Sequence, residues 1–198
     1  MKARLSKNPI LFIVLVIIFI GIGCENQKKN YTWTLPCLPR PIAEETVLIT
    51  SAGQSADTYI VEDIANQLMI HNLFMPQARK TDLEDIKTLV VVVGYSPIGM
   101  KSRDISYNEE KNRILRLLEK SESNNLTVIT LYIGGRQRRS TETDELLQLV
   151  SPKTDYLISL QEANFDGFFI EIAKKYNIPL TLVKSVNDIS EPFASAFR

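Results

Sequence analysis

The stretch that decides the fold class is TVLITSAGQSADTYIVEDIANQL, residues Thr46–Leu68. Its apolar run Val47–Ile49 predicts a strand, and the polar turn Thr50–Ser55 that follows contains Gly53. Apolar residues at helical spacing come directly after the turn. A strand, a tight loop and a helix in that order form the opening unit of an α/β sheet. The loop of such a unit is also where folds of this class commonly bind a ligand.

The same alternation continues along the chain. The run Thr88–Val93 is the strongest strand, and its unbroken apolar character indicates burial on both faces, as in a central parallel strand. The helix expected over residues 108–121 would turn Glu109, Glu110, Lys111 and Arg113 towards solvent. Further strands are expected at 72–75, 126–133, 155–160 and 180–183, and further helices at 60–68, 141–150, 166–176 and 186–197.

This pattern predicts a three-layer, doubly wound α/β fold with a mostly parallel sheet of five or six strands. The sequence leaves a flavodoxin-like and a Rossmann-like strand order open.

The N-terminus resembles an export signal. Basic residues precede the apolar run Ile10–Ile20, and small residues then lead to Cys24. The run from Ile10 to Cys24 is 15 residues long, which is short for a spanning helix but typical of a signal peptide. Cys24 after a glycine resembles the lipobox of bacterial lipoproteins, although Gly21 stands where leucine is usual. A lipidated Cys24, an uncleaved membrane anchor and soluble secretion therefore all stay open.

The chain divides into three parts. Residues 1–24 are the signal peptide or membrane anchor, and 25–45 form a proline-bearing tether. Residues 46–198 form a single α/β domain. We expect the protein to be exported and anchored on the outer side of the cytoplasmic membrane or in the cell envelope.

Composition excludes several classes of function. The chain has 198 residues with no net charge, and without residues 1–24 it has 20 bases and 23 acids, a net charge of −3. Nucleic acid is therefore not an expected partner, because its backbone demands a basic face. The two cysteines, Cys24 and Cys37, both lie before the predicted domain, which argues against a catalytic thiol. If Cys24 is not lipidated, the two could form a disulfide.

The first loop at the carboxyl edge of the predicted sheet offers an anion site. Ser51, Gly53, Gln54 and Ser55 would place free backbone N–H groups and polar side chains at a helix N-terminus. Asp57 argues instead for a simple helix cap, with Gly53 permitting the turn. The three-glycine dinucleotide fingerprint is missing, so no cofactor is expected.

Two further loops add to this edge. Gly94 and Ser96 begin a loop that resembles a P-loop until Met100 separates Gly99 from Lys101, which argues against a nucleoside triphosphate. The loop after strand 126–133 holds Gly135 and three arginines, of which Arg136 is nearest the strand end. Arginines beside glycines suit a carboxylate or phosphate, although a solvated basic loop is the alternative.

Catalytic residues are harder to find. The single histidine, His71, lies at the wrong end of its helix for the carboxyl edge, and no nucleophile elbow is present. Asp57, Glu162 and Asp166 on separate loops are weak candidates for a metal site, and none is expected. Asp166 could also simply cap the helix after it.

Several motifs together resemble one family. They are TSAGQSAD at Thr50–Asp57, VVVG at Val91–Gly94, IGG-R at Ile133–Arg136 and DGFF at Asp166–Phe169. The chain is similar here to an uncharacterised bacterial family of exported α/β proteins, a domain of unknown function. The resemblance implies the fold and export but no mechanism.

The expected function is therefore binding of a small polar or anionic ligand, without catalysis. The candidate ligand-binding residues are Ser51, Gly53, Gln54, Ser55, Gly94, Ser96, Gly135 and Arg136, with Cys24 as the lipidation site. A hydrolase or transferase using Asp57 or Asp166 is one alternative. A structural or partner-binding envelope protein is another.

Overall fold

The computed structural model describes residues 34–198. The predicted signal segment, Cys24 and the first part of the predicted tether lie outside these residues. The described part contains one sheet of six strands in the order β2-β1-β3-β4-β5-β6, and every neighbouring pair is parallel. The order confirms the doubly wound class and is flavodoxin-like, with a sixth strand added at one edge.

Helices and strands alternate as the sequence predicts. The strands are β1 (Val47–Ala52), β2 (Asn72–Phe74), β3 (Thr88–Val93), β4 (Thr127–Tyr132), β5 (Tyr156–Leu160) and β6 (Leu180–Val183). The α-helices are α2 (Asp57–Gln67), α3 (Pro97–Ser102), α4 (Tyr107–Ser123), α5 (Thr141–Val150), α6 (Phe168–Tyr176) and α7 (Ser190–Ala194). Short 3-10 helices are η1 (Lys80–Leu83), η2 (Arg136–Arg138), η3 (Ser151–Lys153), η4 (Gln161–Asn164) and η5 (Val186–Ile189).

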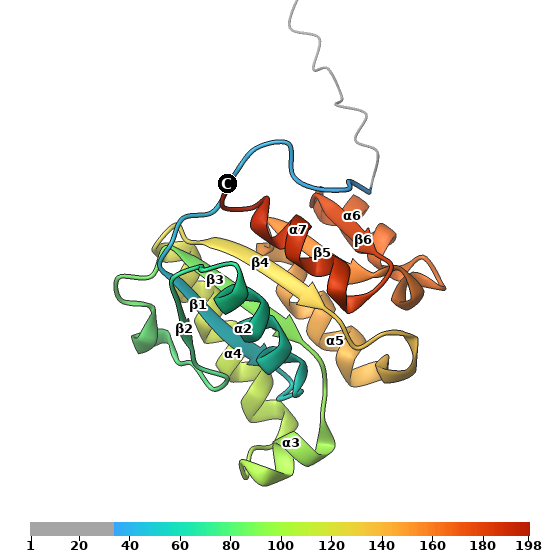
Figure 1. Cartoon of the computed structure of the whole chain (residues 1–198). Coiled ribbons are helices and arrows are strands. Elements are labelled where there is room, and N and C mark those ends of the chain that lie inside the picture. The colour runs from blue at the N-terminus through green and yellow to red at the C-terminus, as the bar shows by residue number, and fades with distance from the viewer. Residues whose placement is uncertain (1–33) are drawn as a thin grey trace, which may run out of the picture. The chain divides into compact units, whose positions relative to one another are not determined.

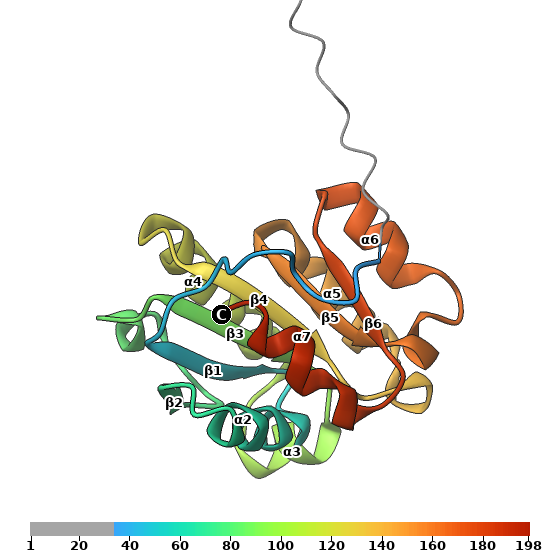
Figure 2. The ribbon, with the colours of Figure 1, turned by 45° about the horizontal axis from the view of Figure 1, so that its top comes forward.

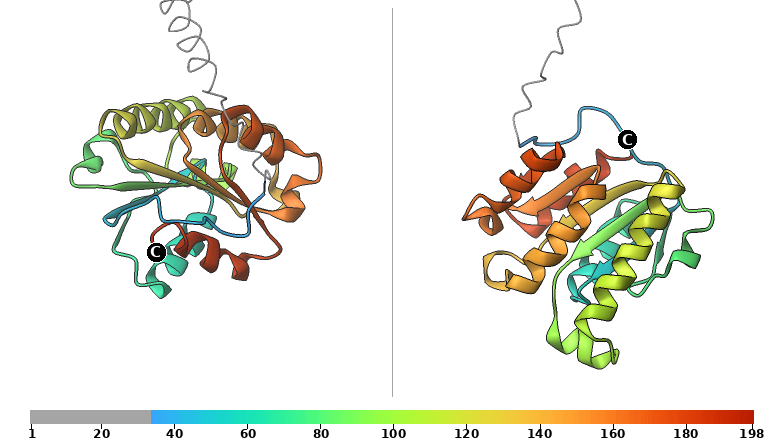
Figure 3. Two further views of the ribbon diagram at one scale, coloured as in Figure 1. Left: turned by 90° about the horizontal axis from the view of Figure 1, so that it is seen from above. Right: turned by 180° about the vertical axis from the view of Figure 1, so that it is seen from behind.

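The helices form two layers around the sheet (Figure 1). Seen along the sheet in Figure 3, α4, α5 and α6 cover one face, and α2 and α7 cover the other. The change of face follows from right-handed crossovers, because the chain moves from β1 to β2 in one direction and from β3 to β6 in the other.

The core explains why the central strands read as continuous apolar runs. All six residues of β1 and of β3 are buried, because helices cover both faces of these strands. Several hydroxyls inside the core are paired with each other: those of Thr130 and Thr154 lie 2.7 Å apart, and those of Tyr156 and Thr181 lie 2.5 Å apart. Such pairing removes most of the cost of burying a hydroxyl.

Three elements differ from the sequence-based expectation. The helix expected at 186–197 is instead η5 followed by the shorter α7, which ends at Ala194. A short helix, α3, occupies part of the expected loop 94–103; Ser96 Oγ caps it by accepting from Gly99 N, and Pro97 stands at its first position. β1 continues past Ile49 to Ala52, because Thr50 and Ser51 pair with Val91 and Val92 of β3.

Residues 34–46, which we call the strap, cross the amino ends of the strands (Figure 2). Leu35 N donates to Leu180 O at the β6 edge, and Leu38 N donates to Ser195 Oγ. Further along, Ala43 N donates to Ala196 O, and Glu44 N donates to Thr88 Oγ1 at the start of β3. The described part of the expected tether is thus bonded to the domain from one edge strand to the centre of the sheet.

Candidate functional site

The direction of the strand order reverses between β1 and β3. The loops after these two strands leave the sheet in opposite directions, and open α/β sheets commonly bind ligands in the crevice between such loops. Six of the eight predicted ligand-binding residues lie here: Ser51, Gly53, Gln54, Ser55, Gly94 and Ser96.

Backbone pairing joins the two loops across this point. Gln54 and Tyr95 form an isolated antiparallel bridge, with Ser96 N donating to Gly53 O at 2.8 Å and Ser55 N donating to Gly94 O at 3.1 Å. Gly53 has a φ of +101°, and a Cβ atom at this position would lie 2.6 Å from Gly94 O. Glycine is therefore required both by the backbone conformation and by the close approach of the second loop.

Three N–H groups of the first loop, those of Gly53, Ser55 and Asp57, are already bonded within the protein, although the sequence led us to expect them free. Gly53 N donates to Glu110 Oε1 at 2.9 Å, and Asp57 N donates to Ser55 Oγ at 3.2 Å. Two side-chain atoms of this region, Ser51 Oγ and Gln54 Oε1, are buried and have no hydrogen-bond partner among residues 34–198. The bonded N–H groups thus stabilise the loop itself, and the loop offers an anion fewer free donors than the sequence predicts.

A buried ion pair beneath the loop holds it in place. Glu110 has no exposed surface, and both of its oxygens accept from Arg113 at 2.8 Å. Glu110 Oε1 also accepts from Gln54 Nε2 at 2.9 Å. Burial acts to raise the pKa of Glu110, but the bonds from Arg113, Gly53 and Gln54 hold the pKa below its ordinary value.

The sequence-based expectation that Glu110 faces solvent is wrong. Glu110 lies four residues before Ile114 and seven before Leu117, both of which are fully buried, so it belongs to the apolar stripe of α4. That spacing, together with an arginine three residues later, is the sequence feature that indicates a buried ion pair at Glu110.

Arg113 has no donor left for a ligand. Besides its two bonds to Glu110, Nη1 donates to Ala78 O at 2.8 Å and to Thr50 Oγ1 at 3.3 Å, and Nη2 donates to Ser51 O. A guanidinium has five N–H donors, and all five are used. Arg113 therefore fixes the end of β1 to the connection between β2 and β3.

The three arginines after β4 have different surroundings. Arg138 pairs with Asp57, which is 2% exposed, at 2.6 Å. Arg139 is bonded to Asp144, Asp166 and Ala163 O, and its guanidinium lies 4.4 Å from the ring centre of Phe168. Arg136 lies 4.5 Å from the ring centre of Phe165 and has no ion pair within the described part of the chain.

Gly135 and Arg136 thus lie on a loop beside the other six predicted residues, connected to them through the Arg138–Asp57 pair. Gly135 has a φ of +65°, and a Cβ atom there would lie 2.2 Å from Glu162 Oε1. Asp166 caps α6 by accepting from Phe168 N at 3.2 Å. Its slight burial acts to raise the pKa, but the bonds from Arg139 and from Phe168 N hold it below its ordinary value.

A pocket that sequence reasoning missed lies beside the carboxyl ends of β1 and β2. We call it the η1–α4 pocket; its volume is about 510 Å³, and it is lined by Arg79, Lys80, Thr81, Asp104, Ile105, Glu109, Asn112, Arg113 and Arg116. The side chains of Arg79, Lys80 and Arg116 make no hydrogen bond or ion pair to any residue in 34–198. Three unpaired cations therefore surround one pocket.

The same residues 34–198 contain no cluster of three or more His, Cys, Asp or Glu side chains that could hold a metal ion. None of their helices has the length and apolar character needed to span a bilayer.

Comparison with known proteins gives a family. The family model described as Domain of unknown function (DUF6305) matches residues 44–197, which is nearly the whole folded domain. No curated protein and no solved structure matches the chain. The family description assigns no activity, so any function has to be argued from the residues themselves.

Proposed function

The chain belongs to the DUF6305 family, and we propose that it is an exported, membrane-tethered domain that binds a small anionic ligand beside the carboxyl ends of β1 and β2. The observation that carries this proposal is the set of three unpaired cations, Arg79, Lys80 and Arg116, around the η1–α4 pocket. A volume of about 510 Å³ is within the range of small-molecule sites.

The charges of the pocket favour a carboxylate or phosphate. Arg113 is neutralised by Glu110 and holds the wall rather than the ligand. Glu109 Oε2 accepts from Ser106 N at 2.8 Å, so this carboxylate is engaged in capping α4. Asp104 is then the one remaining lining acid, against three cations. An anion in this pocket would accept charge-assisted hydrogen bonds from these three cations, whose donors otherwise face water.

Thermal unfolding of the full-length protein with inorganic phosphate and with citrate tests this site. We expect either ion to raise the midpoint of the wild type. Lys80→Gln and Arg116→Gln should each weaken binding about tenfold or more, which is the effect of losing a charged hydrogen bond. Lys120→Gln changes a cation on the same helix outside the pocket, and it should leave the shift unchanged.

Arg136→Ala separates this pocket from the loop site predicted from sequence. Arg136 is also an unpaired cation at the carboxyl edge, but its neighbouring loops are joined to each other by backbone bonds. If Arg136→Ala abolishes the shift and Arg116→Gln does not, the ligand binds at the predicted loops and the η1–α4 pocket is the wrong site. If no anion shifts the wild type, anion binding itself is refuted.

The enzyme alternative has less support. A general acid or base needs a carboxyl whose pKa is tuned towards neutrality. Asp57 is instead paired with Arg138 at 2.6 Å, and Asp166 is bonded to Arg139 with its pKa held low. Both carboxylates have structural partners.

Partner binding is a second candidate, favoured by exposed apolar side chains on the α2 and β2 side of the domain. Tyr59, Met69 and Leu73 are exposed, and Tyr59 packs on Phe74 with ring centres 4.9 Å apart. Crosslinking in intact cells would test it: Leu73→Glu should remove any crosslinked species that the wild type forms.

Export and anchoring rest on the N-terminal sequence. Cell fractionation should find the protein in the membrane fraction, and mass spectrometry of its mature N-terminus should find a lipid on Cys24. An unmodified chain beginning at Met1 would favour the uncleaved anchor instead. A cytoplasmic protein would refute export.

A further inference from the structure

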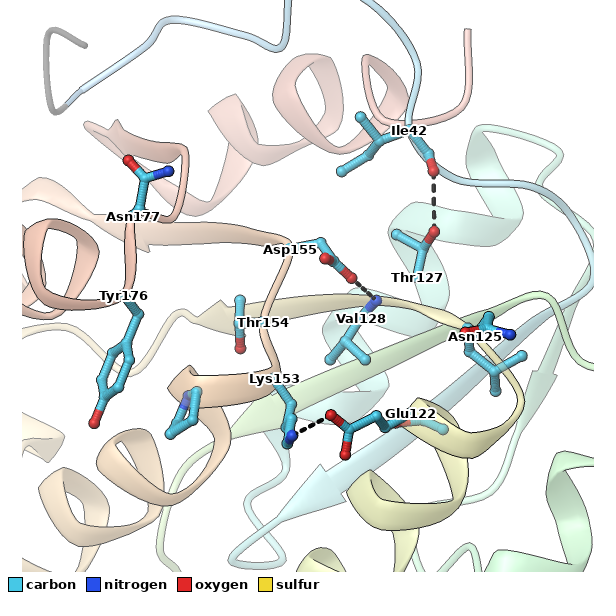
Figure 4. Close-up of a pocket in the computed structure, with 13 residues that line it drawn as sticks. Ile42, Glu122, Asn125, Thr127, Val128, Lys153, Thr154, Asp155, Tyr176 and Asn177 are labelled. Atoms are coloured by element: carbon cyan, nitrogen blue, oxygen red, sulfur yellow. Dashed lines mark hydrogen bonds and ion pairs between the residues drawn. The ribbon is translucent and has the colours of Figure 1, made fainter. Parts of the chain in front are cut away.

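A second pocket lies at the opposite, amino edge of the sheet, at the start of β4 and β5 (Figure 4). We call it the amino-edge pocket; its volume is about 710 Å³. Its walls come from the end of α4, the turn between α6 and β6, η3 and the strap. They comprise Ile42, Ser121, Glu122, Asn125, Leu126, Thr127, Val128, Pro152, Lys153, Thr154, Asp155, Tyr176 and Asn177.

The charged groups of this pocket do not suit an anion. Lys153 is the single basic residue of the wall, and it forms an ion pair with Glu122, drawn as a dashed line in Figure 4. Asp155 Oδ2 accepts from Val128 N at 2.8 Å, and Asp155 N donates to Val128 O at 2.8 Å. These two bonds close the ladder between β4 and β5 and leave Asp155 Oδ1 as a free acceptor.

The hydroxyls of Ser121, Thr127 and Thr154 are bonded within the protein, and three other uncharged polar groups of the wall are not. The side-chain amides of Asn125 and Asn177 and the hydroxyl of Tyr176 have no hydrogen-bond partner within residues 34–198. Figure 4 shows Tyr176 and Asn177 on one side of Asp155 and Asn125 on the other. The pocket therefore presents amide donors and acceptors, a hydroxyl and one carboxylate oxygen from opposite walls.

The two asparagines have a backbone role that is separate from their amides. Asn125 has a φ of +55° and Asn177 a φ of +56°, and each follows the end of a helix. Asparagine and glycine both tolerate this left-handed conformation. The left-handed backbone explains why asparagine or glycine is suited to each position. It does not explain the presence of a side-chain amide there.

From these groups we infer that the amino-edge pocket binds a neutral, polyhydroxylated ligand of the carbohydrate class. A sugar hydroxyl both donates and accepts, so it can satisfy Asp155 Oδ1 and the amides at once. Ile42 of the strap, which is 36% exposed, supplies an apolar surface for the C–H groups of a sugar ring. A phosphate or carboxylate would instead meet Asp155 without a free cation to offset the repulsion.

Isothermal titration calorimetry on the full-length protein tests the inference, with N-acetylglucosamine, galactose and maltose as probes. We expect at least one of them to bind the wild type. Asn177→Gly keeps the left-handed backbone and removes the amide, and Tyr176→Phe removes a single hydroxyl. Each should weaken binding about three- to tenfold, the effect of losing one hydrogen bond.

Met69→Gly is the matched control, because Met69 also has a positive φ, of +57°, and is 83% exposed away from this pocket. It should leave sugar binding unchanged. Absence of binding by all three sugars, or equal binding by Asn177→Gly and the wild type, would overturn the inference. So would binding of a diamine such as putrescine in place of the sugars. Lys80→Gln and Arg116→Gln should not affect sugar binding, so failure here is distinguishable from failure of the anion site.

Discussion

Glu110 and Arg113, three residues apart on α4, form a bidentate ion pair beneath the loop after β1, with both N–O distances at 2.8 Å. Arg113 is only 13% exposed and Glu110 is not exposed at all. The pair ties together β1, the connection after β2 and the tight turn at Gly53.

Glu110→Gln should destabilise the domain strongly. Removing one charge leaves the Arg113 guanidinium buried without its counter-ion, and breaking such a pair costs about 3–5 kcal/mol. Chemical denaturation measures the loss. Glu109→Gln is the matched control, because Glu109 is the exposed neighbour and glutamine can still accept in the α4 cap. Equal stability of the two variants would contradict the structural role of Glu110.

Acid should remove this contribution selectively. The pKa of Glu110 is lower in the folded protein than its ordinary value of 4.5. A carboxyl of this kind stabilises the fold above its unfolded pKa, and the contribution is lost as the pH falls through the folded pKa. Wild-type stability should therefore decline below about pH 4.5, while Glu110→Gln should lack this component. Parallel stability curves for the two proteins over this range would refute the prediction.

Gly53→Ala should cost more than Gly167→Ala. Both glycines have positive φ, but a Cβ atom at Gly53 would lie 2.6 Å from Gly94 O, whereas a Cβ atom at Gly167 would have nothing within 4 Å. Gly167→Ala should thus lower the free energy of unfolding by about 1–2 kcal/mol, which is the cost of placing a Cβ atom in the left-handed conformation. Gly53→Ala should lose that and also displace the loop after β3, and the midpoints of thermal unfolding will rank the two.

Asp155→Asn should raise the melting temperature at pH 7. Partial burial raises the pKa of Asp155, against the opposing effect of the bond from Val128 N, so this carboxyl binds its proton more tightly in the folded protein than in the unfolded chain. Stability then falls as the pH rises through the window between the unfolded and folded pKa values. Asparagine keeps an acceptor for Val128 N and carries no charge, so its advantage should shrink near pH 3.

Asp155→Ala is the comparison for that variant. It removes the acceptor as well as the charge, and it should lower the melting temperature at both pH values, because it leaves Val128 N without its side-chain partner. A stabilised alanine variant would mean that the hydrogen bond contributes nothing.

Local pattern was sufficient for the fold class. The run Thr88–Val93 could only be a central strand, because it has no polar side to expose. α3 was not foreseen, since its six residues are too few to show helical periodicity, although Ser96 followed by Pro97 is a typical helix start.

The site was harder to predict than the fold. Gly53 and Gly94 could be brought together by assuming a parallel sheet, but nothing in the sequence shows that the N–H group of Gly53 donates to Glu110, 57 positions away. The η1–α4 pocket combines Lys80 and Arg116 from elements that meet only through the crossover between β2 and β3. Contacts between residues so far apart in the chain produce no recognisable pattern in the local sequence.

The strap has a practical consequence for how this domain is delimited. The family match begins at residue 44, yet the main chain is bonded to the domain from Leu35 onward, through Leu180 O, Ser195 Oγ and Ala196 O. A recombinant fragment cut at the family boundary would lose these bonds and uncover the end of α7 and the outer edge of β6. The folded domain is therefore longer at its N-terminal end than the region that the family model matches. Expression of this domain should start no later than residue 34.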